Sequence, residues 1–316
     1  MLPSSTWVVT EAYAGLQAQA LGLTEAAGLV SELRVLTARG LWRHVPPRWW
    51  PAPLDAIEPG TLAPPLPDLL VGCGGKAASV LAALRTPARR VPGRCVIVQH
   101  PRMDPRRFDL IVAARHDEIT GPNVIVTRTA LHRVRPARLA EAADAWAPRL
   151  AHLPRPLVAV LVGGANGRFR LDVAVATALA GQLAGMMRAD HVGLALTPSR
   201  RTDPAVRAVF TGTLAPLGAM VWDGAGDNPY LGMLALADAI VVTADSVSMM
   251  SEAVATRAPV LLAELPGHSR RIGLFLRGLL DDGRARRYGG RYEAWPVTPI
   301  DDTPAAAAEM CRRFGY

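Results

Sequence analysis

The feature that most constrains this chain is the regular alternation of short apolar, β-branched runs with helix-forming segments. In the first half, such runs occupy residues 6–10, 33–36, 68–73, 95–99, 110–114 and 123–127. In the second half, they occupy residues 156–164, 191–199, 219–224, 238–245 and 258–265. Strands that alternate with helices predict mostly parallel, doubly wound sheets, because a right-handed helical crossover joins each strand to a parallel neighbour. The predicted fold class is therefore α/β with two Rossmann-like domains.

The domain boundary is predicted in segment 138–156, a helical stretch that ends at two prolines. Proline disfavours helix for the residue before it, so the helix cannot continue into the next strand. We expect an N-terminal domain at 1–137, a linker helix and hinge at 138–156, a C-terminal domain at 157–302 and a final helix at 303–316. Two domains also suit a length of 316 residues, since single domains usually have about 100 to 200 residues.

The net charge of +8 comes almost entirely from arginine, because Lys76 is the only lysine. A basic balance is compatible with nucleic acid, anionic lipid or a phosphorylated small molecule as partner. The arginines are scattered and no interleaved aromatic platform accompanies them, so we predict no nucleic-acid partner. A hydrophobic fraction of 50% argues against a disordered chain.

The three cysteines, Cys73, Cys95 and Cys311, lack metal-ligand spacing. We expect buried free thiols and no bound metal. The N-terminal residues lack the basic and apolar regions of a signal peptide, and no apolar run approaches the ~18 residues that a membrane span needs. These features predict a cytoplasmic protein.

The proline- and tryptophan-rich segment 41–68 has neither helical nor strand periodicity. It is compatible with a structural surface loop. The alternative is an amphipathic patch that touches a membrane interface or lipid acceptor, with Trp42, Trp49, Trp50, Arg43 and Arg48 as its residues. That alternative predicts peripheral contact with the inner face of the membrane.

Glycines follow two of the predicted strands. Gly163 and Gly164 open the stretch "GGANGRF", and glycine there lets the backbone turn sharply and offers amide N–H groups to an anion. A plain tight turn is an equally good interpretation. Gly74, Gly75 and Lys76 repeat the arrangement in the first half, where a structural turn is favoured.

The stretch "AIVVTADSVSMMSEAVATR" predicts a buried strand followed by a helix. Asp245 or Ser246 is a good N-cap, and the first-turn N–H groups with the Ser246 and Ser248 hydroxyls form a candidate anion site. Glu252 lies within two turns of that site, where its carboxylate is able to accept hydrogen bonds from ribose hydroxyls. The alternative is an ordinary capped helix with Glu252 in solvent. Upstream, Asn228 is a predicted N-cap for a second helix, with Pro229 at its first position.

Candidate catalytic groups cluster near the ends of two first-half strands. His100 follows one, and His116 and Asp117 follow the next. Strand ends collect ligands and catalytic groups in doubly wound sheets, so each of the three is a candidate general base. A structural role is the alternative for each residue.

Long blocks of the chain resemble the mitochondrial fission "elongated mitochondria" family, whose bacterial members have a GT-B glycosyltransferase-like architecture. These blocks are "QALGLTEA", "MDPRRFDLIVAARHDEITGPNVIVT", "LVGGANGRFRLD", "TPSRRTDPAV" and "WDGAGDNPYLGMLALADAIVVTADSVSMMSEA". The resemblance implies two Rossmann-like domains that face each other across a cleft, an acceptor-side N-terminal domain and a C-terminal domain that binds a nucleotide-diphosphate sugar.

Site residues follow from this resemblance. It places the donor at Gly163, Gly164, Ser246, Ser248 and Glu252, while the loop "GGANGRF" replaces the commoner "GGDSK" and leaves Asn166 and Arg168 near the phosphates. The remaining binding candidates are Ser199, Arg200, Arg201, Asn228 and Asp245. Such enzymes need neither bound metal nor cofactor, only the nucleotide-sugar donor.

Two functions agree with this resemblance. One is transfer of a sugar from the donor to a cell-envelope acceptor, with arginines offsetting the charge of the leaving diphosphate. The other is a non-catalytic binding or scaffold protein of GT-B shape. Bacterial relatives are often labelled nucleoside-diphosphate-sugar epimerases, yet the chain has neither the GxxGxxG nor the YxxxK pattern of a nicotinamide-dependent epimerase.

Overall fold

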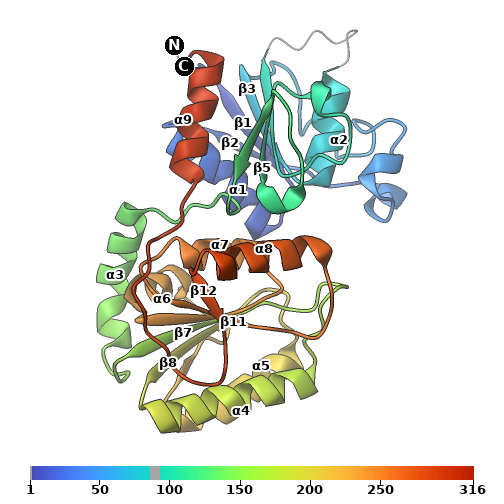
Figure 1. Cartoon of the computed structure of the whole chain (residues 1–316). Helices are drawn as coiled ribbons and strands as arrows, with labels where there is room; N and C mark the ends of the chain where they lie inside the picture. Colours follow the sequence, from blue (N-terminus) through green and yellow to red (C-terminus); the bar gives the residue numbers. More distant parts are fainter. Residues whose placement is uncertain (1, 86–92) are drawn as a thin grey trace. The chain divides into compact units, whose positions relative to one another are not determined.

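The computed structural model describes residues 2–85 and 93–316. Its contacts divide the chain into two compact units. The first unit contains Met1–Arg133 together with Asp301–Tyr316, and the second contains Val134–Ile300. Both units are α/β structures with a parallel sheet (Figure 1).

The first sheet has the strand order β2-β1-β3-β4-β5-β6, and all its pairings are parallel. Its strands are β1 Thr6–Thr10, β2 Glu32–Val35, β3 Leu69–Cys73, β4 Arg94–Val98, β5 Leu110–Ala114 and β6 Val124–Thr127. Its helices are α1 Ala14–Ala26, α2 Gly75–Leu84 and α9 Thr303–Phe314, with short 3-10 turns η1 Gly40–Arg43, η2 Pro47–Trp49, η3 Pro105–Arg107 and η4 Arg115–Asp117. The C-terminal helix α9 packs on α1, so the chain returns to the first unit.

Successive residues of the first sheet feed two separate apolar layers, because side chains alternate between the faces of a strand. Trp7 and Val9 of β1 pack in one cluster with α2, whereas Val8 packs in the other with α1 and α9. Both faces of β1 are therefore covered, which explains why all five of its residues are buried.

The second sheet has the order β12-β11-β10-β7-β8-β9, again with parallel pairings. Its strands are β7 Leu157–Val162, β8 Gly193–Pro198, β9 Met220–Val221, β10 Ala239–Thr243, β11 Val260–Ala263 and β12 Ala285–Arg287. Its helices are α3 Pro136–Leu150, α4 Val173–Asp190, α5 Pro204–Leu214, η5 Ala215–Leu217, α6 Tyr230–Leu236, α7 Val247–Val254 and α8 Arg270–Asp281. The edge strand β12 has no counterpart among the predicted strands, since two of its three residues are arginines.

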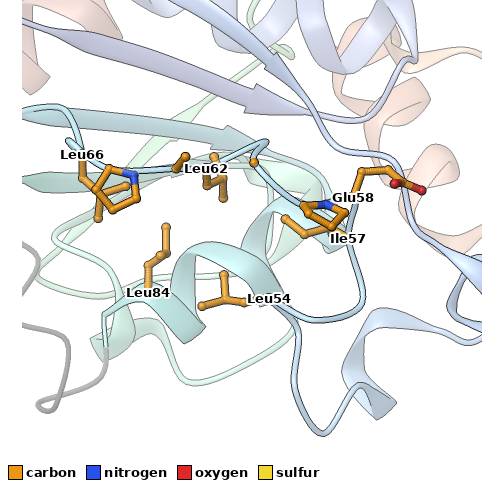
Figure 2. A pocket seen from close by; sticks show the side chains of 10 residues that line it. Leu54, Ile57, Glu58, Leu62, Leu66 and Leu84 are labelled. Atoms are coloured by element: carbon orange, nitrogen blue, oxygen red, sulfur yellow. The ribbon is translucent and has the colours of Figure 1, made fainter.

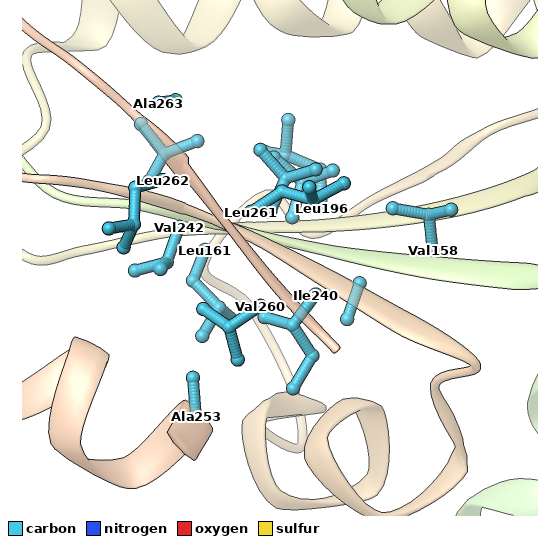
Figure 3. Close-up of a cluster of buried hydrophobic side chains, with 14 of the residues drawn as sticks. Val158, Leu161, Leu196, Ile240, Val242, Ala253, Val260, Leu261, Leu262 and Ala263 are labelled. Atoms are coloured by element: carbon cyan, nitrogen blue, oxygen red, sulfur yellow. The ribbon is translucent and has the colours of Figure 1, made fainter. Parts of the chain in front are cut away.

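The core of the second unit lies on both sides of β7, β10 and β11, whose residues are all buried. Figure 3 shows Leu161, Val242 and Leu262 among the side chains that fill it. Helices α4 and α5 lie together on one face of this sheet, and α7 and α8 lie on the other (Figure 1). The helix in segment 138–156, which was expected as a linker, is α3 Pro136–Leu150, and it packs against α6 within the second unit.

The strand order places a topological switch point in each sheet. From β7 the chain moves outward through β8 and β9, then returns to the other side of β7 with β10. The loops after β7 and β10 consequently leave the sheet in opposite directions. The edge between these two loops is called the crevice below, because open α/β sheets bind ligands at such a switch point. In the first sheet the equivalent point lies between β1 and β3.

Candidate functional site

The glycine loop after β7 forms one side of the second switch point. A Cβ on Gly163 would overlap the Asp245 carboxylate, and a Cβ on Gly164 would overlap the backbone carbonyl of Arg201. The Gly163 amide donates to Thr243 Oγ1 at 2.7 Å, and the Gly164 amide donates to Asp245 Oδ2 at 3.2 Å. The expectation that both amides are free for an anion is therefore wrong, because both already have partners. Glycine is required here for close packing.

The buried carboxylate of Asp245 joins the loops of this edge. Thr243 Oγ1 donates to its Oδ1 at 2.7 Å, and Arg201 Nη2 lies 3.1 Å from its Oδ2. Asn166 Nδ2 also donates to the backbone oxygen of Asp245 at 3.2 Å. Three loops, after β7, β8 and β10, are thus held together before any ligand binds.

The loop after β8 is held by hydrogen bonds from its own hydroxyls and from helix α5. Ser199 Oγ and Thr202 Oγ1 lie 3.1 Å apart, and Thr202 Oγ1 donates to the backbone oxygen of Gly163. Arg207 of α5 donates to the backbone oxygens of Thr202 and Ser199, each at 3.0 Å. The Ser199 hydroxyl therefore forms its hydrogen bonds within this loop and stabilises the loop conformation.

Three arginines border the crevice. Arg201 also donates to the Gly164 carbonyl at 3.1 Å, yet 41% of its side chain stays exposed. Arg200 is exposed, and Arg168 is exposed with its Nη1 3.4 Å from Ser269 Oγ. Asn166 Oδ1 accepts from the backbone amide of Arg168 at 3.1 Å, so it stabilises the part of the glycine loop that carries Arg168. The result is a positively charged rim.

Helix α7 begins at this crevice. Ser246 is its N-cap, with Oγ accepting from the Met249 amide at 3.4 Å, whereas Asp245 points into the loop network. Ser246 and Ser248 are both half-buried. The first turn therefore presents amide groups and two hydroxyls at the carboxyl edge of the sheet.

Glu252 lies further along α7, where it is half-buried rather than solvated. Its Oε2 accepts a hydrogen bond from the Tyr230 hydroxyl of α6. Burial raises the pKa of Glu252 to about 7, although the Tyr230 hydrogen bond and the nearby Arg138 both favour the charged form. A carboxyl group with a pKa near neutrality beside a crevice is typical of a functional position.

Asn228 prepares the position of Tyr230. Helix α6 begins at Tyr230, one residue later than expected, and Asn228 Oδ1 accepts from the Tyr230 amide at 2.9 Å. Tyr230 was not among the predicted site residues, since a tyrosine in the helical run "YLGMLAL" is an ordinary core residue by pattern. Only its contact with Glu252 distinguishes it.

The three predicted catalytic groups all lie at the carboxyl edge of the first sheet. His100 follows β4, and its Nδ1 accepts from the Arg102 amide at 2.8 Å, which makes it part of a local turn. His116 is buried in η4 directly after β5, and Asp117 is its neighbour. Their catalytic role stays a prediction.

The switch point of the first sheet holds an ion pair that the sequence did not reveal. Lys76 Nζ lies 2.7 Å from Glu11 Oε1. Glu11 directly follows β1, and Lys76 follows the Gly74 turn after β3. The only lysine of the chain thus has a carboxylate partner, and the position of Glu11 after the first strand was the available signal.

A cavity of about 320 Å³ lies elsewhere in the first unit. Figure 2 shows its largely apolar wall, with Leu54, Ile57, Leu62, Leu66, Leu84 and Glu58 among the lining residues. The catalytic candidates do not line it.

Within residues 2–85 and 93–316, no group of histidine, cysteine, aspartate and glutamate side chains is arranged to hold a metal ion. Cys73, Cys95 and Cys311 form no disulfide, and burial raises the pKa of Cys95 to about 12. Among the helices of the described part of the chain, none has the length and apolar character to cross a bilayer.

The sequence profile described as mitochondrial fission ELM1 matches residues 14–314. The chain belongs to this family. It is 32% identical over 278 residues to the mitochondrial fission protein ELM1 of Arabidopsis thaliana, which covers 78% of this chain and 64% of the plant protein. It is 28% identical over 166 residues to an uncharacterized protein of Rickettsia prowazekii (strain Madrid E), which covers 49% of this chain and 47% of that protein. This chain therefore spans less than two thirds of the length of either relative.

Solved structures with a similar fold come from nucleotide-sugar enzymes. UDP-GlcNAc 2-epimerase from Neisseria meningitidis, bound to UDP-GlcNAc, has a TM-score of 0.53 at 10% identity and covers 98% of this chain and 100% of its own. The S. aureus MnaA–UDP structure has a TM-score of 0.57 at 12% identity, and the match covers 99% of this chain and 96% of that structure's chain. Medicago truncatula UGT71G1 with UDP-glucose has a TM-score of 0.50 at 11% identity, and the match covers 97% of this chain and 89% of that structure's chain. The predicted GT-B-like α/β fold is confirmed for this member of the ELM1 family.

Proposed function

We propose that this protein binds a nucleoside-diphosphate sugar at the switch point between β7 and β10 and transfers the sugar to a cell-envelope acceptor. The observation that supports it most is the juxtaposition of the α7 start, an arginine rim and the half-buried Glu252 at the carboxyl edge of the second sheet. Proteins of the same fold have been solved with UDP or a UDP-sugar.

The chemistry of the crevice suits the two halves of such a ligand. The diphosphate would meet the first turn of α7, with the Ser246 and Ser248 hydroxyls, because a helix start stabilises negative charge. Arg168, Arg200 and Arg201 would offset the remaining charge, which makes a bound metal unnecessary. Six residues along a helix rise about 9 Å, so Glu252 would accept from the ribose hydroxyls.

The other predicted binding residues support this arrangement indirectly. Gly163 and Gly164 let the loop approach Asp245 and Arg201, while Asp245 holds the loops in place. Asn166 bonds within its own loop and to the Asp245 backbone oxygen, Ser199 bonds within its own loop, and Asn228 orients Tyr230. Their contribution is to position the groups that touch the ligand.

Transfer also requires a base. The acceptor hydroxyl oxygen would form a bond to the anomeric carbon of the sugar as the bond from that carbon to the phosphate oxygen breaks. The nucleoside diphosphate leaves with the electron pair, and His116, Asp117 or His100 would take the acceptor proton.

Peripheral membrane contact is also proposed, through a smaller patch than segment 41–68 suggested. Trp50 is buried and donates from Nε1 to the Val45 carbonyl at 3.0 Å, so it anchors the loop. Leu41 and Trp49 are 82% and 67% exposed, with Arg48 over the Trp49 ring at 5.7 Å. Exposed apolar groups beside arginines suit an anionic lipid surface or a lipid-linked acceptor. We propose the cytoplasmic face of the membrane as the place of this contact.

Two other functions remain testable alternatives. A non-catalytic scaffold is favoured by the relative named as a mitochondrial fission protein. An epimerase is favoured by the fold, because proteins named UDP-GlcNAc 2-epimerase have a similar one. The alternatives differ in what happens to a bound nucleotide sugar.

Calorimetry of the purified protein against uridine, guanosine and cytidine diphosphate sugars tests the proposal. We expect one donor to bind, Glu252→Ala to abolish binding, and Glu141→Ala on the exposed face of α3 to leave it unchanged. Absence of binding across the panel contradicts the proposal. Binding without turnover in the presence of envelope lipid acceptors favours the scaffold, and a changed sugar without an acceptor favours the epimerase.

A further inference from the structure

We propose that Tyr230 is a positioning residue of the ribose site, whose hydroxyl orients the Glu252 carboxylate and sets the pH range in which the nucleotide binds. This inference rests on the proposed function. Tyr230 is not among the site residues predicted from the sequence, and the inference is supported by its contact with Glu252, which joins α6 to α7.

The geometry begins at the start of α6. Tyr230 is the first residue of that helix, and its amide is held by Asn228 Oδ1 at 2.9 Å. Its ring packs against the core of the second unit, and its hydroxyl donates to Glu252 Oε2 on α7. Among the described residues, no further hydrogen bond engages Glu252 Oε1, which leaves that oxygen to accept from a ribose hydroxyl.

The groups that face Glu252 come from two other helices. Tyr230 on α6 and Arg138 on α3 both favour the carboxylate, while burial opposes it more strongly, so the pKa of Glu252 is about 7. Burial and the adjacent Glu252 raise the pKa of Tyr230 well above its usual range. Tyr230 therefore stays a neutral donor near neutral pH, and Glu252 is the group of this pair that titrates.

The charged form of Glu252 is the better acceptor for two hydroxyl donors. Nucleotide affinity should therefore rise as the pH increases through 7. If only the carboxylate form binds, the affinity at pH 6 is about tenfold weaker than at pH 8. Removing the tyrosine hydroxyl removes a bond that favours the carboxylate, which moves the midpoint to higher pH.

The experiment measures the dissociation constant of uridine diphosphate by calorimetry from pH 6 to pH 9, or of whichever nucleoside diphosphate the donor panel identifies. We expect the wild type to lose about tenfold between pH 8 and pH 6. Tyr230→Phe keeps the ring, and its loss of affinity relative to wild type should be largest at pH 6 and should shrink toward pH 9. Tyr288→Phe is the matched control, because Tyr288 is a tyrosine of the same unit that contacts Met186 Sδ.

Each outcome separates this inference from the proposed function. A flat wild-type profile overturns the pH dependence while nucleotide binding itself stands. A loss in Tyr230→Phe that is equal at every pH assigns the tyrosine a merely structural role and overturns the inference. Absence of binding at any pH by the wild type, for every nucleotide in the panel, overturns both.

Discussion

Asp245 occupies the space into which a side chain at Gly163 would project. Its carboxylate also accepts from the Gly164 amide and pairs with Arg201. The crevice between β7 and β10 is consequently built around an internal carboxylate that holds its loops together. Preorganised loops lower the entropic cost of binding a ligand.

Gly163→Ala tests this packing. The added methyl group would force the Asp245 carboxylate away from the loop, so we expect the free energy of unfolding to fall by about 2–3 kcal/mol. Urea denaturation measures it. Gly181→Ala is the control, since Gly181 lies in α4 with open space around its Cβ position, and it should raise stability by about 0.5–1 kcal/mol. Equal effects of the two substitutions would contradict the packing argument.

Asp245→Asn tests the loop clamp. The substitution removes the charge that faces Arg201 and turns one acceptor into a donor, and we expect a loss of about 2–3 kcal/mol in unfolding free energy. Arg201→Gln should cost only about 1 kcal/mol, because 41% of the Arg201 side chain is exposed. A double-mutant cycle by chemical denaturation measures the coupling, and additive losses would show that the two side chains act independently.

Glu252→Gln should raise the free energy of unfolding at pH 8 while it weakens nucleotide binding. The Glu252 pKa is raised from 4.5 to about 7, so the folded state keeps a proton that the unfolded chain releases. The cost of ionising Glu252 in the fold is absent below pH 4.5 and complete above pH 7. Relative to wild type, the variant should gain about 1–3 kcal/mol at pH 8 and nothing at pH 4. Thermal unfolding at the two pH values measures this difference, and a pH-independent gain would refute it.

The two neighbouring tryptophans should behave differently. Trp50→Ala should lower stability by about 3–5 kcal/mol, because Trp50 is buried. Trp49→Ala should leave the unfolding free energy within about 0.5 kcal/mol of wild type and weaken binding to phosphatidylglycerol-containing vesicles in a sedimentation assay. Unchanged vesicle binding in Trp49→Ala would remove the support for membrane contact.

The sequence by itself determined the elements and the fold class. Runs 6–10 and 110–114 are β1 and β5 at the predicted bounds, and the strand before Asp245 lies where its uncharged β-branched residues predicted it. These outcomes are local, because strand formation in a covered sheet depends on an apolar run bounded by turn residues. The short edge strand β12 escaped prediction, since an edge strand needs no such run.

Only the tertiary structure decided how the site residues face one another. Glu252 and Tyr230 lie on different helices, and Asp245 and Arg201 lie on different loops. Which loops meet depends on the order in which strands join the sheet, and that order follows from crossover packing rather than from local pattern. The sequence therefore located the crevice, while the fold turned Asp245 inward and brought a tyrosine hydroxyl to Glu252.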